Sequence, residues 1–320
     1  MKVRLKDIAK GYRISGFFFR LFVPYAPRWL YPIMNFCSAL YHPRWRSKTT
    51  SCKEVFLPRE DGSKLRCLVY SPIAPAKEKM TCVVYFHGGG YASGTAESGK
   101  SYVKLFTQES DAVVVSVDYR LSTKAPYPAA LDDACLALKH LHDHAEDFGI
   151  DPRQIFVAGE SSGGGLACAA ALRCRDTHEA PIACQIALYP MLDDRDTETS
   201  HDNNAPVWNH RSNVVAWKMY LRNVVGEVPP YAAPARAESV AGLPPLIGYV
   251  GELDPFFAED MTYVSRLSEA GIETRFRTFP KCFHTFDTFK KKHPLAHEAF
   301  AFLKEAFAYA KAHYRFKGIA

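Results

Sequence analysis

From residue 53 onward, short apolar runs alternate with longer segments in which apolar residues recur at helical spacing. Continuous or alternating apolar residues predict strands at 54–58, 65–72, 81–86, 112–119, 154–160, 184–190, 246–251 and 274–279. The periodic segments between them predict helices near 98–110, 128–147, 162–175, 257–271 and 294–313. This alternation is typical of an α/β fold, with a mostly parallel central sheet of about eight strands and helices on both faces.

Two segments break the alternation. Residues 1–48 precede the first strand and are rich in aromatic residues, whereas residues 193–236 start with a polar run (DDRDTETSHDNN) and continue with Trp208, Trp217 and Tyr220. We interpret the second segment as an insertion rather than a linker, and we expect the two segments together to form one cap. The rest of the chain is then a single main domain, residues 49–320, that carries the insertion.

The first of these segments is strongly basic. Residues 1–48 hold ten Lys or Arg residues against one acid, Asp7, a net charge of +9, so the other 272 residues carry −3 of the total of +6. The apolar stretch at 14–34 is interrupted by Arg20, Pro24, Pro27 and Arg28, which argues against a membrane span and a signal peptide. We favour a helical lid that packs its aromatic face on the body. A segment that touches anionic lipid is the open alternative, and no recognised nucleic-acid-binding module is present.

Composition limits the other classes. Hydrophobic residues make up 48% and charged residues 23% of the chain, which allows a sizeable core and an ordinary soluble surface. The nine cysteines are scattered, odd in number and without a CxxC pair. We therefore expect reduced thiols and a cytoplasmic location rather than a disulfide framework. The same pattern, with no HExxH motif among the 12 histidines, argues against a metal site.

A glycine-rich turn lies between a predicted strand and a predicted helix. Its sequence, VAGESSGGG at 157–165, contains the pattern GxSxG from Gly159 to Gly163. In that context the middle residue, Ser161, sits on a tight turn with its hydroxyl projecting from the sheet edge. The start of the following helix places partial positive charge and free N–H groups beside it. Ser161 is therefore the candidate nucleophile.

A second glycine run follows the strand at 81–86. It reads HGGG, from His87 to Gly90. Backbone N–H groups without side chains in the way suit a negative charge that develops during a reaction. We expect His87 itself to make structural hydrogen bonds rather than to act as the base, because it precedes the nucleophile and begins a loop.

A serine hydroxyl also needs a base and an acid that orients the base. In this architecture the chain order is Ser, then Asp or Glu, then His. Asp254 and His284 each follow a late predicted strand, at the edge where sites of open α/β sheets are built. The less well placed competitors are Glu252, Asp260, Asp287, His293 and His297.

Several motifs in order resemble one family. HGGG, DYRLSTKAPYPAALDD (118–133), GESSGG, YP (189–190), ELDP and the late histidine are similar to those of hormone-sensitive-lipase-like carboxylesterases, which have the α/β-hydrolase fold. The resemblance covers roughly residues 53–313. The chain departs from the usual pattern at three places, which bear on substrate preference more than on activity: Ser122-Thr123-Lys124, Ser162, and Thr285-Phe286 after the histidine.

The resemblance implies a set of roles. Ser161, Asp254 and His284 would form the catalytic triad. Backbone N–H groups of Gly88, Gly89 and Ser162 would form the oxyanion hole, while Asp118 and Arg120 would be structural. The family's cap, built from an N-terminal segment and an insertion, agrees with the two irregular segments, and residues 49–320 would be the α/β-hydrolase domain. Neither a metal nor an organic cofactor is needed.

The expected substrate is a small-molecule ester with a short acyl chain. By their proximity to the motifs, bulky aromatic residues would restrict the acyl site: Tyr91, Trp208, Phe256, Phe257 and Phe283. Three alternatives stay open, namely an amidase or peptidase on the same fold, a lipase-like enzyme at a lipid surface, and a non-catalytic binding protein, against which the intact triad argues. No nucleic-acid partner is expected, and a homodimer is left open.

Overall fold

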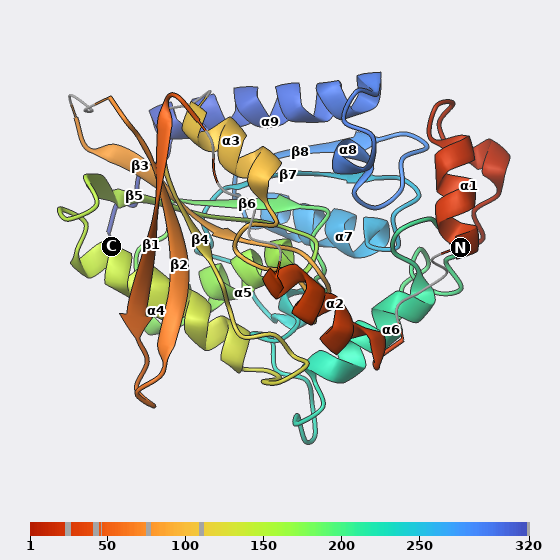
Figure 1. The fold of residues 1–320 in the computed structure, drawn as a ribbon, viewed down its shortest axis with the longest axis horizontal. Coiled ribbons are helices and arrows are strands. Elements are labelled where there is room, and N and C mark those ends of the chain that lie inside the picture. Colours follow the sequence, from red (N-terminus) through yellow and green to blue (C-terminus); the bar gives the residue numbers. More distant parts are fainter. Residues whose placement is uncertain (23–26, 41–44, 46, 75–77, 109–111, 319–320) are drawn as a thin grey trace.

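A single mixed sheet forms the centre of the molecule (Figure 1). The computed structural model describes residues 1–22, 27–40, 45, 47–74, 78–108 and 112–318. Within them the strands are β1 (Thr50–Pro58), β2 (Lys64–Pro72), β3 (Met80–Phe86), β4 (Val113–Val117), β5 (Ile150–Glu160), β6 (Cys184–Leu188), β7 (Leu246–Gly251) and β8 (Thr274–Phe279). Their order is β1-β2-β4-β3-β5-β6-β7-β8, and only the pairs β1–β2 and β2–β4 are antiparallel. The predicted eight-stranded, mostly parallel sheet is confirmed.

Helices cover both faces of this sheet (Figure 1). One face packs against α3 (Lys100–Gln108), α8 (Phe286–Phe289) and α9 (Pro294–His313), and the other against α4 (Ala129–Asp143), α5 (Ser162–Thr177) and α7 (Phe257–Glu269). Strand β3 shows why: Val84 joins the core with α4 and α5, whereas its neighbours Val83 and Tyr85 join the core with α3 and α9. A strand buried on both faces reads as a continuous apolar run.

Two strands, β1 and β5, each begin four residues before their predicted starts, and β5 shows the reason most clearly. Strand β5 begins at Ile150, four residues before the predicted start at 154, because Ile150 pairs with Met80 ahead of a register shift in β3. The intervening residues, Asp151 to Arg153, are polar and include a proline, so the apolar pattern did not reveal them. The C-terminal ends of the parallel strands, which position the site, follow the predicted pattern closely.

The two irregular segments contact each other. The first contains η1 (Leu5–Asp7), α1 (Arg13–Phe22) and α2 (Leu30–Leu40), and the insertion contains α6 (His210–Tyr220) and η2 (Pro234–Arg236). Arg20 Nη1 donates to the carbonyl oxygen of Asn204 at 3.3 Å, Gly16 packs closely on Pro206, and Tyr31 is buried with Met219. In Figure 1, α1 and α6 lie at the right of the view, and α2 lies between α6 and the centre.

The first segment is helical, but the expected packing of its aromatic face is wrong for α1. Five side chains of this helix are 41–75% exposed: Ile14, Phe17, Phe18, Leu21 and Phe22. The inward face instead carries Gly16, which allows close approach, and Arg20, whose guanidinium donates to the carbonyl oxygens of Val3 and Asn204. In the described part of the chain, no helix has both the length and the apolar character needed to cross a bilayer.

Packing between α9 and the sheet gives a test of the fold. The ring of Phe307 lies 4.7 Å from that of Phe106 and 6.0 Å from that of Phe156, and it is fully buried. Phe307→Ala is expected to lower the free energy of unfolding by about 3–5 kcal/mol, because it removes buried area and leaves a cavity. Urea unfolding of the variant measures this loss. The control, Val225→Ala at an exposed position, is expected to change it by less than about 0.5 kcal/mol.

Candidate active site

Ser161 occupies a strained turn between β5 and α5. Its backbone angles are φ 57° and ψ −124°, in the left-handed half of conformational space that non-glycine residues rarely enter. The flanking glycines are sterically required. A Cβ at Gly159 would lie 2.3 Å from the Gly163 carbonyl, and a Cβ at Gly163 would lie 2.0 Å from the carbonyl oxygen of Phe86. The two glycines of the GxSxG pattern are therefore required because α5 approaches the sheet so closely.

The structure brings together the three side chains that the sequence placed in a triad. His284 Nε2 lies 2.9 Å from Ser161 Oγ, and His284 Nδ1 lies 2.7 Å from Asp254 Oδ2. The three residues are buried, with exposed fractions of 4% for Ser161, 2% for His284 and 0% for Asp254. Because ionised aspartate only accepts, the network assigns the Nδ1 proton to a bond with Asp254 and leaves Nε2 to accept from the serine hydroxyl.

Aromatic rings surround the imidazole. The ring centroid of His284 lies 4.9 Å from that of Tyr189 and 5.2 Å from that of Phe256, both in edge-to-face geometry. Trp208 covers a third side, with its ring centroid 6.1 Å away. These contacts fix the orientation of the imidazole and limit the access of water, which strengthens the hydrogen bonds on either side of it.

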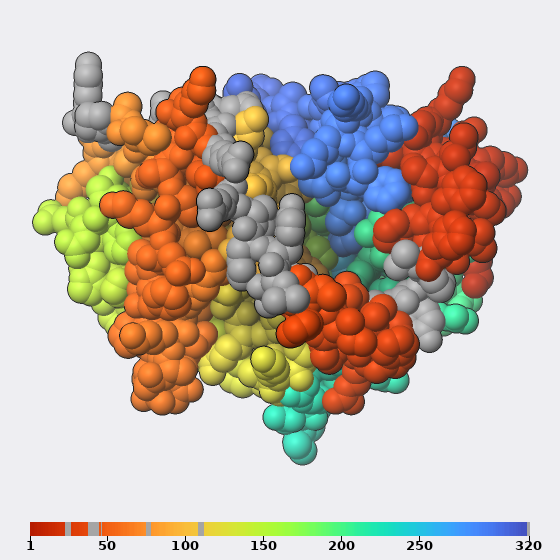
Figure 2. All heavy atoms as spheres, in the orientation of Figure 1, coloured from red at the N-terminus to blue at the C-terminus, as the bar shows by residue number. Residues whose placement is uncertain are grey.

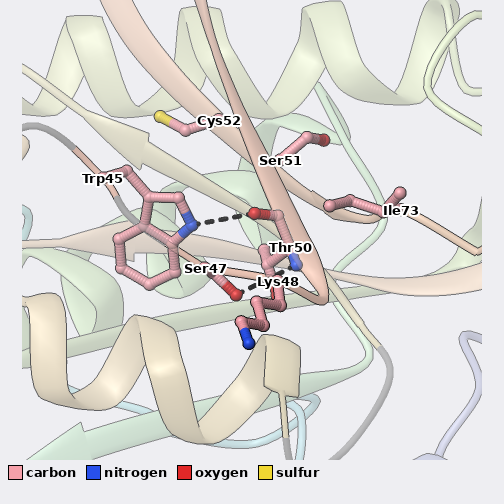
Figure 3. A pocket seen from close by; sticks show the side chains of 7 residues that line it. All are labelled: Trp45, Ser47, Lys48, Thr50, Ser51, Cys52 and Ile73. Atoms are coloured by element: carbon pink, nitrogen blue, oxygen red, sulfur yellow. Dashed lines mark hydrogen bonds between the residues drawn. The ribbon is translucent and has the colours of Figure 1, made fainter.

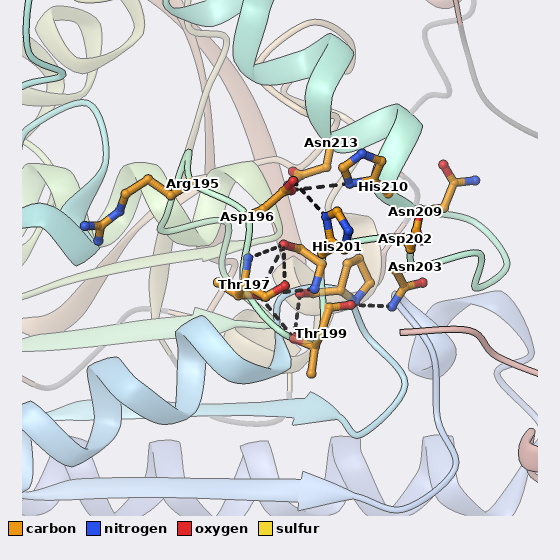
Figure 4. Close-up of polar contacts among 12 residues, drawn as sticks. Arg195, Asp196, Thr197, Thr199, His201, Asp202, Asn203, Asn209, His210 and Asn213 are labelled. Atoms are coloured by element: carbon orange, nitrogen blue, oxygen red, sulfur yellow. Dashed lines mark hydrogen bonds and ion pairs between the residues drawn. The ribbon is translucent and has the colours of Figure 1, made fainter.

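The insertion holds the loop that carries Asp254. Thr199 Oγ1 donates to the Pro255 carbonyl at 3.0 Å and accepts from the Ala258 N–H at 3.0 Å. Asn203 Nδ2 donates to the Leu253 carbonyl at 3.4 Å. Figure 4 shows Thr199 and Asn203 within a wider polar network of the insertion. The insertion thus contacts the main-chain carbonyls on both sides of Asp254.

The structure of the glycine loop shows that the prediction of Gly88 as an oxyanion-hole donor is wrong. The Gly88 N–H donates to Glu160 Oε1 at 2.9 Å, so it is not available to a substrate oxygen. Within the described residues, the N–H groups of Gly89 and Gly90 have no acceptor. Ser162 is the first residue of α5, where the N–H group has no partner inside the helix. Among the described residues, the free N–H donors of the glycine loop are therefore those of Gly89 and Gly90, and Ser162 adds a donor next to Ser161.

Glu160 is a site residue that the sequence reasoning did not identify. One carboxylate oxygen accepts from the Gly88 N–H, and the other pairs with the hydroxyl of Tyr85. Burial raises the pKa of Glu160 to about 7, while these two hydrogen bonds oppose the shift. The signal was present in the sequence: a carboxylate ends the otherwise apolar strand IFVAGE. Glu160 holds the glycine loop against the turn that carries Ser161.

A second buried carboxylate lies beneath the site. Asp287 accepts hydrogen bonds from Tyr249 at 2.6 Å, from Tyr189 at 3.2 Å and from Tyr102. Burial raises its pKa above the ordinary value for aspartate, and the tyrosine hydroxyls oppose that shift. Because its carboxylate oxygens already accept from these tyrosines, Asp287 is not the partner of His284. Asp254 takes that role instead.

A cavity of about 370 Å³ opens onto the triad. Besides Ser161 and His284, its lining includes Gly89, Trp208 and Tyr189. Polar side chains line another part of it: Ser98, Ser101, Thr285, Thr288 and Lys291. The cavity is therefore apolar beside the imidazole and polar elsewhere, the combination expected for a small organic substrate.

Of the predicted pocket residues, Trp208 lines this cavity and four others do not. Tyr91 stacks on Tyr220 with ring centroids 3.9 Å apart, and Phe283 packs on Tyr12 at 5.6 Å. Phe256 packs on His284 with ring centroids 5.2 Å apart but does not line the cavity, and Phe257 lines a separate surface groove. Proximity in sequence to a motif does not determine the direction of a side chain, so neighbours on one loop point to different sides.

Other hollows and clusters lack this chemistry. A groove of about 860 Å³ lies beside β1, and the described residues that line it, Trp45, Thr50 and Ile73 among others, include no histidine (Figure 3). In the part of the chain that the structure describes, the side chains able to hold a metal ion together are Cys135, Cys174 and Glu179. They lie at the α4–α5 contact, and Glu179 is already paired with an arginine.

Comparison with known proteins agrees with this geometry. A family model described as the alpha/beta hydrolase fold matches residues 83–288. The chain belongs to this family. It is 32% identical to the esterase LipI of Mycobacterium tuberculosis over 72% of this chain and 73% of that protein. It is 28% identical to an acetyl-hydrolase of Streptomyces hygroscopicus, over 71% and 74% of the two chains.

A solved structure extends the likeness to nearly the whole chain. A bacterial heroin esterase superposes with a TM-score of 0.88 at 29% identity, covering 96% of this chain and 99% of that one. The α/β-hydrolase fold that the motifs predicted is thereby confirmed.

The raised pKa of Glu160 predicts a pH dependence of stability. Between the ordinary glutamate pKa and about pH 7, the folded state keeps a proton on Glu160 that the unfolded state has lost. The free energy of unfolding therefore decreases as the pH rises through this range. Relative to Glu160→Gln, the free energy of unfolding of the wild type is expected to fall by about 2 kcal/mol between about pH 5 and about pH 8. Urea titrations across this range test the difference, and parallel curves would contradict it.

Proposed function

We propose that the protein is a serine carboxylesterase that hydrolyses small esters with short acyl chains. The observation that carries this proposal is the buried hydrogen-bonded chain from Ser161 through His284 to Asp254, located at a strained turn and open to a cavity. A hydroxyl paired with a neutral imidazole, itself oriented by a carboxylate, is an activated nucleophile. The relatives named as esterases support the same class of reaction.

Acylation begins with attack of Ser161 Oγ on the ester carbonyl carbon. His284 Nε2 accepts the hydroxyl proton as the new bond forms, and Asp254 stabilises the resulting imidazolium through the Nδ1–H bond. The negative charge moves to the former carbonyl oxygen. The N–H groups of Gly89, Gly90 and Ser162 are the donors for this oxyanion, each worth about 3–4 kcal/mol in the transition state.

The tetrahedral intermediate then collapses. His284 donates its proton from Nε2 to the leaving alcohol oxygen, which leaves the acyl group on Ser161. Water attacks this acyl-enzyme in the same geometry, with His284 again as base, and the carboxylic acid departs. Each step uses side chains and main-chain groups of this chain, so the mechanism requires neither a metal nor an organic cofactor.

The restricted cavity favours short acyl groups. Trp208 packs directly over Gly90, where a Cβ would lie 2.5 Å from its ring, so the indole closes one side of the space beside the nucleophile. A cavity of about 370 Å³ suits a small ester better than a long acyl chain. The relative named an acetyl-hydrolase supports the same preference.

The proposal extends to the organisation and location of the enzyme. Residues 1–48 and 193–236 act as one cap over the main domain at 49–320, supported by the contacts of Gly16 with Pro206 and of Tyr31 with Met219. A cytoplasmic location agrees with nine cysteines that are free thiols, seven of them buried.

Substitutions in the triad test the mechanism. Ser161→Ala and His284→Ala are expected to lower kcat/KM for an acetyl ester by at least about 10³-fold, because they remove the nucleophile and its base. Asp254→Asn is expected to lower it by about 10⁴-fold, because an amide cannot favour the required tautomer. The control is His297→Ala, an exposed histidine of α9, which should retain wild-type activity. Unchanged turnover by Ser161→Ala would refute the proposal.

A chain-length series tests the substrate class. Synthetic esters with acyl groups from acetyl to dodecanoyl should give the highest kcat/KM at or below about six carbons, because Trp208 limits the cavity. Trp208→Ala should move this optimum to longer chains. A wild-type optimum at long chains would contradict the prediction, and equal rates on matched esters and amides would favour an amidase instead.

A further inference from the structure

Exposed apolar side chains are concentrated in the first segment of the chain. Of the thirteen large hydrophobic residues exposed in the described part, ten lie between Leu5 and Phe36. The other three are dispersed over the rest of the molecule: Phe56, Ile73 and Val225. Scattered exposed apolar residues are ordinary on a soluble protein, but a concentration of this kind marks an interaction site.

The exposed residues of α1 form one stripe. Ile14, Phe17, Phe18, Leu21 and Phe22 follow the spacing of a single helix face. The opposite face is the one that packs on the protein, through Gly16 on Pro206 and through Phe19 on Phe289, with ring centroids 5.7 Å apart. Helix α1 therefore presents its most apolar face to solvent.

Helix α2 repeats this arrangement. Tyr31 is buried against Ala92, and Asn35 Nδ2 donates to the Ala92 carbonyl at 2.8 Å. The exposed side chains Trp29, Ile33 and Phe36 recur at helical spacing away from these contacts. Figure 2 shows both helices, in red, at the surface on the same face of the molecule.

Positive charge borders the exposed apolar residues. Lys6, Lys10 and Arg28 are exposed in the first segment, which carries a net charge of +9. Lys290 adds a cation beside the start of α1, since its Nζ donates to the Gly11 carbonyl at 2.9 Å. The nearby acid Asp7 is already paired with Arg4. The fringe of the apolar surface is therefore cationic.

We propose that the outer faces of α1 and α2 dock on the surface of a bilayer that contains anionic phospholipid. Apolar side chains beside lysines and arginines are the pattern by which a helix lies in the interface, with its apolar face among the acyl chains and its cations at the headgroups. Helix α1 has ten residues, so it lies along a membrane and does not cross it.

The charge of the surface favours an anionic bilayer over a second copy of the chain as its binding partner. A twofold dimer would bring the same surface of two molecules together and would therefore place like cationic fringes opposite each other. An anionic bilayer offers the complementary charge over the whole area. The exposed cations Lys6, Lys10 and Arg28, with Lys290 beside the start of α1, thus favour lipid over self-association.

Docking would place the catalytic cavity close to the membrane. Helix α1 packs on Phe283 and Phe289, on either side of the loop that holds His284, and α2 packs on Ala92, which follows the glycine loop. Both helices therefore border the site. This inference rests on the exposed surface alone and does not depend on the reaction that Ser161 performs.

Vesicle flotation with the full chain tests the proposal. We expect the wild type to bind vesicles of phosphatidylglycerol much more strongly than vesicles of phosphatidylcholine, and to be released by about 1 M NaCl. Phe18→Ser combined with Phe22→Ser should weaken binding by about a hundredfold, because two large apolar side chains no longer enter the bilayer. Lys6→Gln combined with Lys10→Gln should weaken binding to the anionic vesicles only.

Matched controls separate docking from folding and from catalysis. Ile73→Ser combined with Val225→Ser changes two exposed apolar residues elsewhere and should bind like the wild type. All these variants should hydrolyse a water-soluble acetyl ester at the wild-type rate, and Ser161→Ala should bind vesicles normally. Absence of wild-type binding, or equal binding by the Phe18/Phe22 variant, would overturn the proposal. A dimer in sedimentation velocity that this variant dissociates would identify the surface as a contact between copies.

Discussion

The contact between the first turn of α5 and the end of β3 leaves no space for a side chain, and the site depends on it. At Gly163 a single added carbon would collide with the Phe86 carbonyl oxygen, and at Gly159 it would collide with the helix. Because the backbone is held this closely, Ser161 can occupy a conformation that an unsupported serine would leave. The same contact brings the glycine loop after β3 beside the nucleophile.

Buried polar groups hold in place the loops and side chains of the site that the sheet itself does not position. Glu160 ties the glycine loop to the nucleophile turn, and Asp287 gathers three tyrosine hydroxyls beneath the cavity. The aromatic rings of Tyr189, Phe256 and Trp208 set the plane of the imidazole. Thus the glycine loop, the turn that carries Ser161 and the imidazole of His284 are each held by neighbouring residues. These neighbours take no part in the reaction but limit the motion of the groups that do.

The sequence contained most of the fold and the chemical groups of the site, and the reason is physical. Strand and helix periodicity follows from burial, and the glycine motifs follow from steric exclusion, so both are readable in one chain. Side-chain direction is set by tertiary contacts and is not readable in the same way. This explains why Trp208 reaches the cavity whereas Tyr91 turns back onto Tyr220, and why the Gly88 N–H is engaged by Glu160. It also explains the outward face of α1, where Arg20 takes the inner position.

The insertion is not an independent lid that could be exchanged between relatives at will. Thr199 and Asn203 bind the main-chain carbonyls that flank Asp254, so the polypeptide that shapes one wall of the cavity also anchors the catalytic carboxylate. A chimera that imports another cap would need to preserve these two anchors, or it would gain a new specificity at the expense of a correctly oriented imidazole. A change in the insertion that alters which substrates fit the cavity can therefore also disturb the orientation of His284.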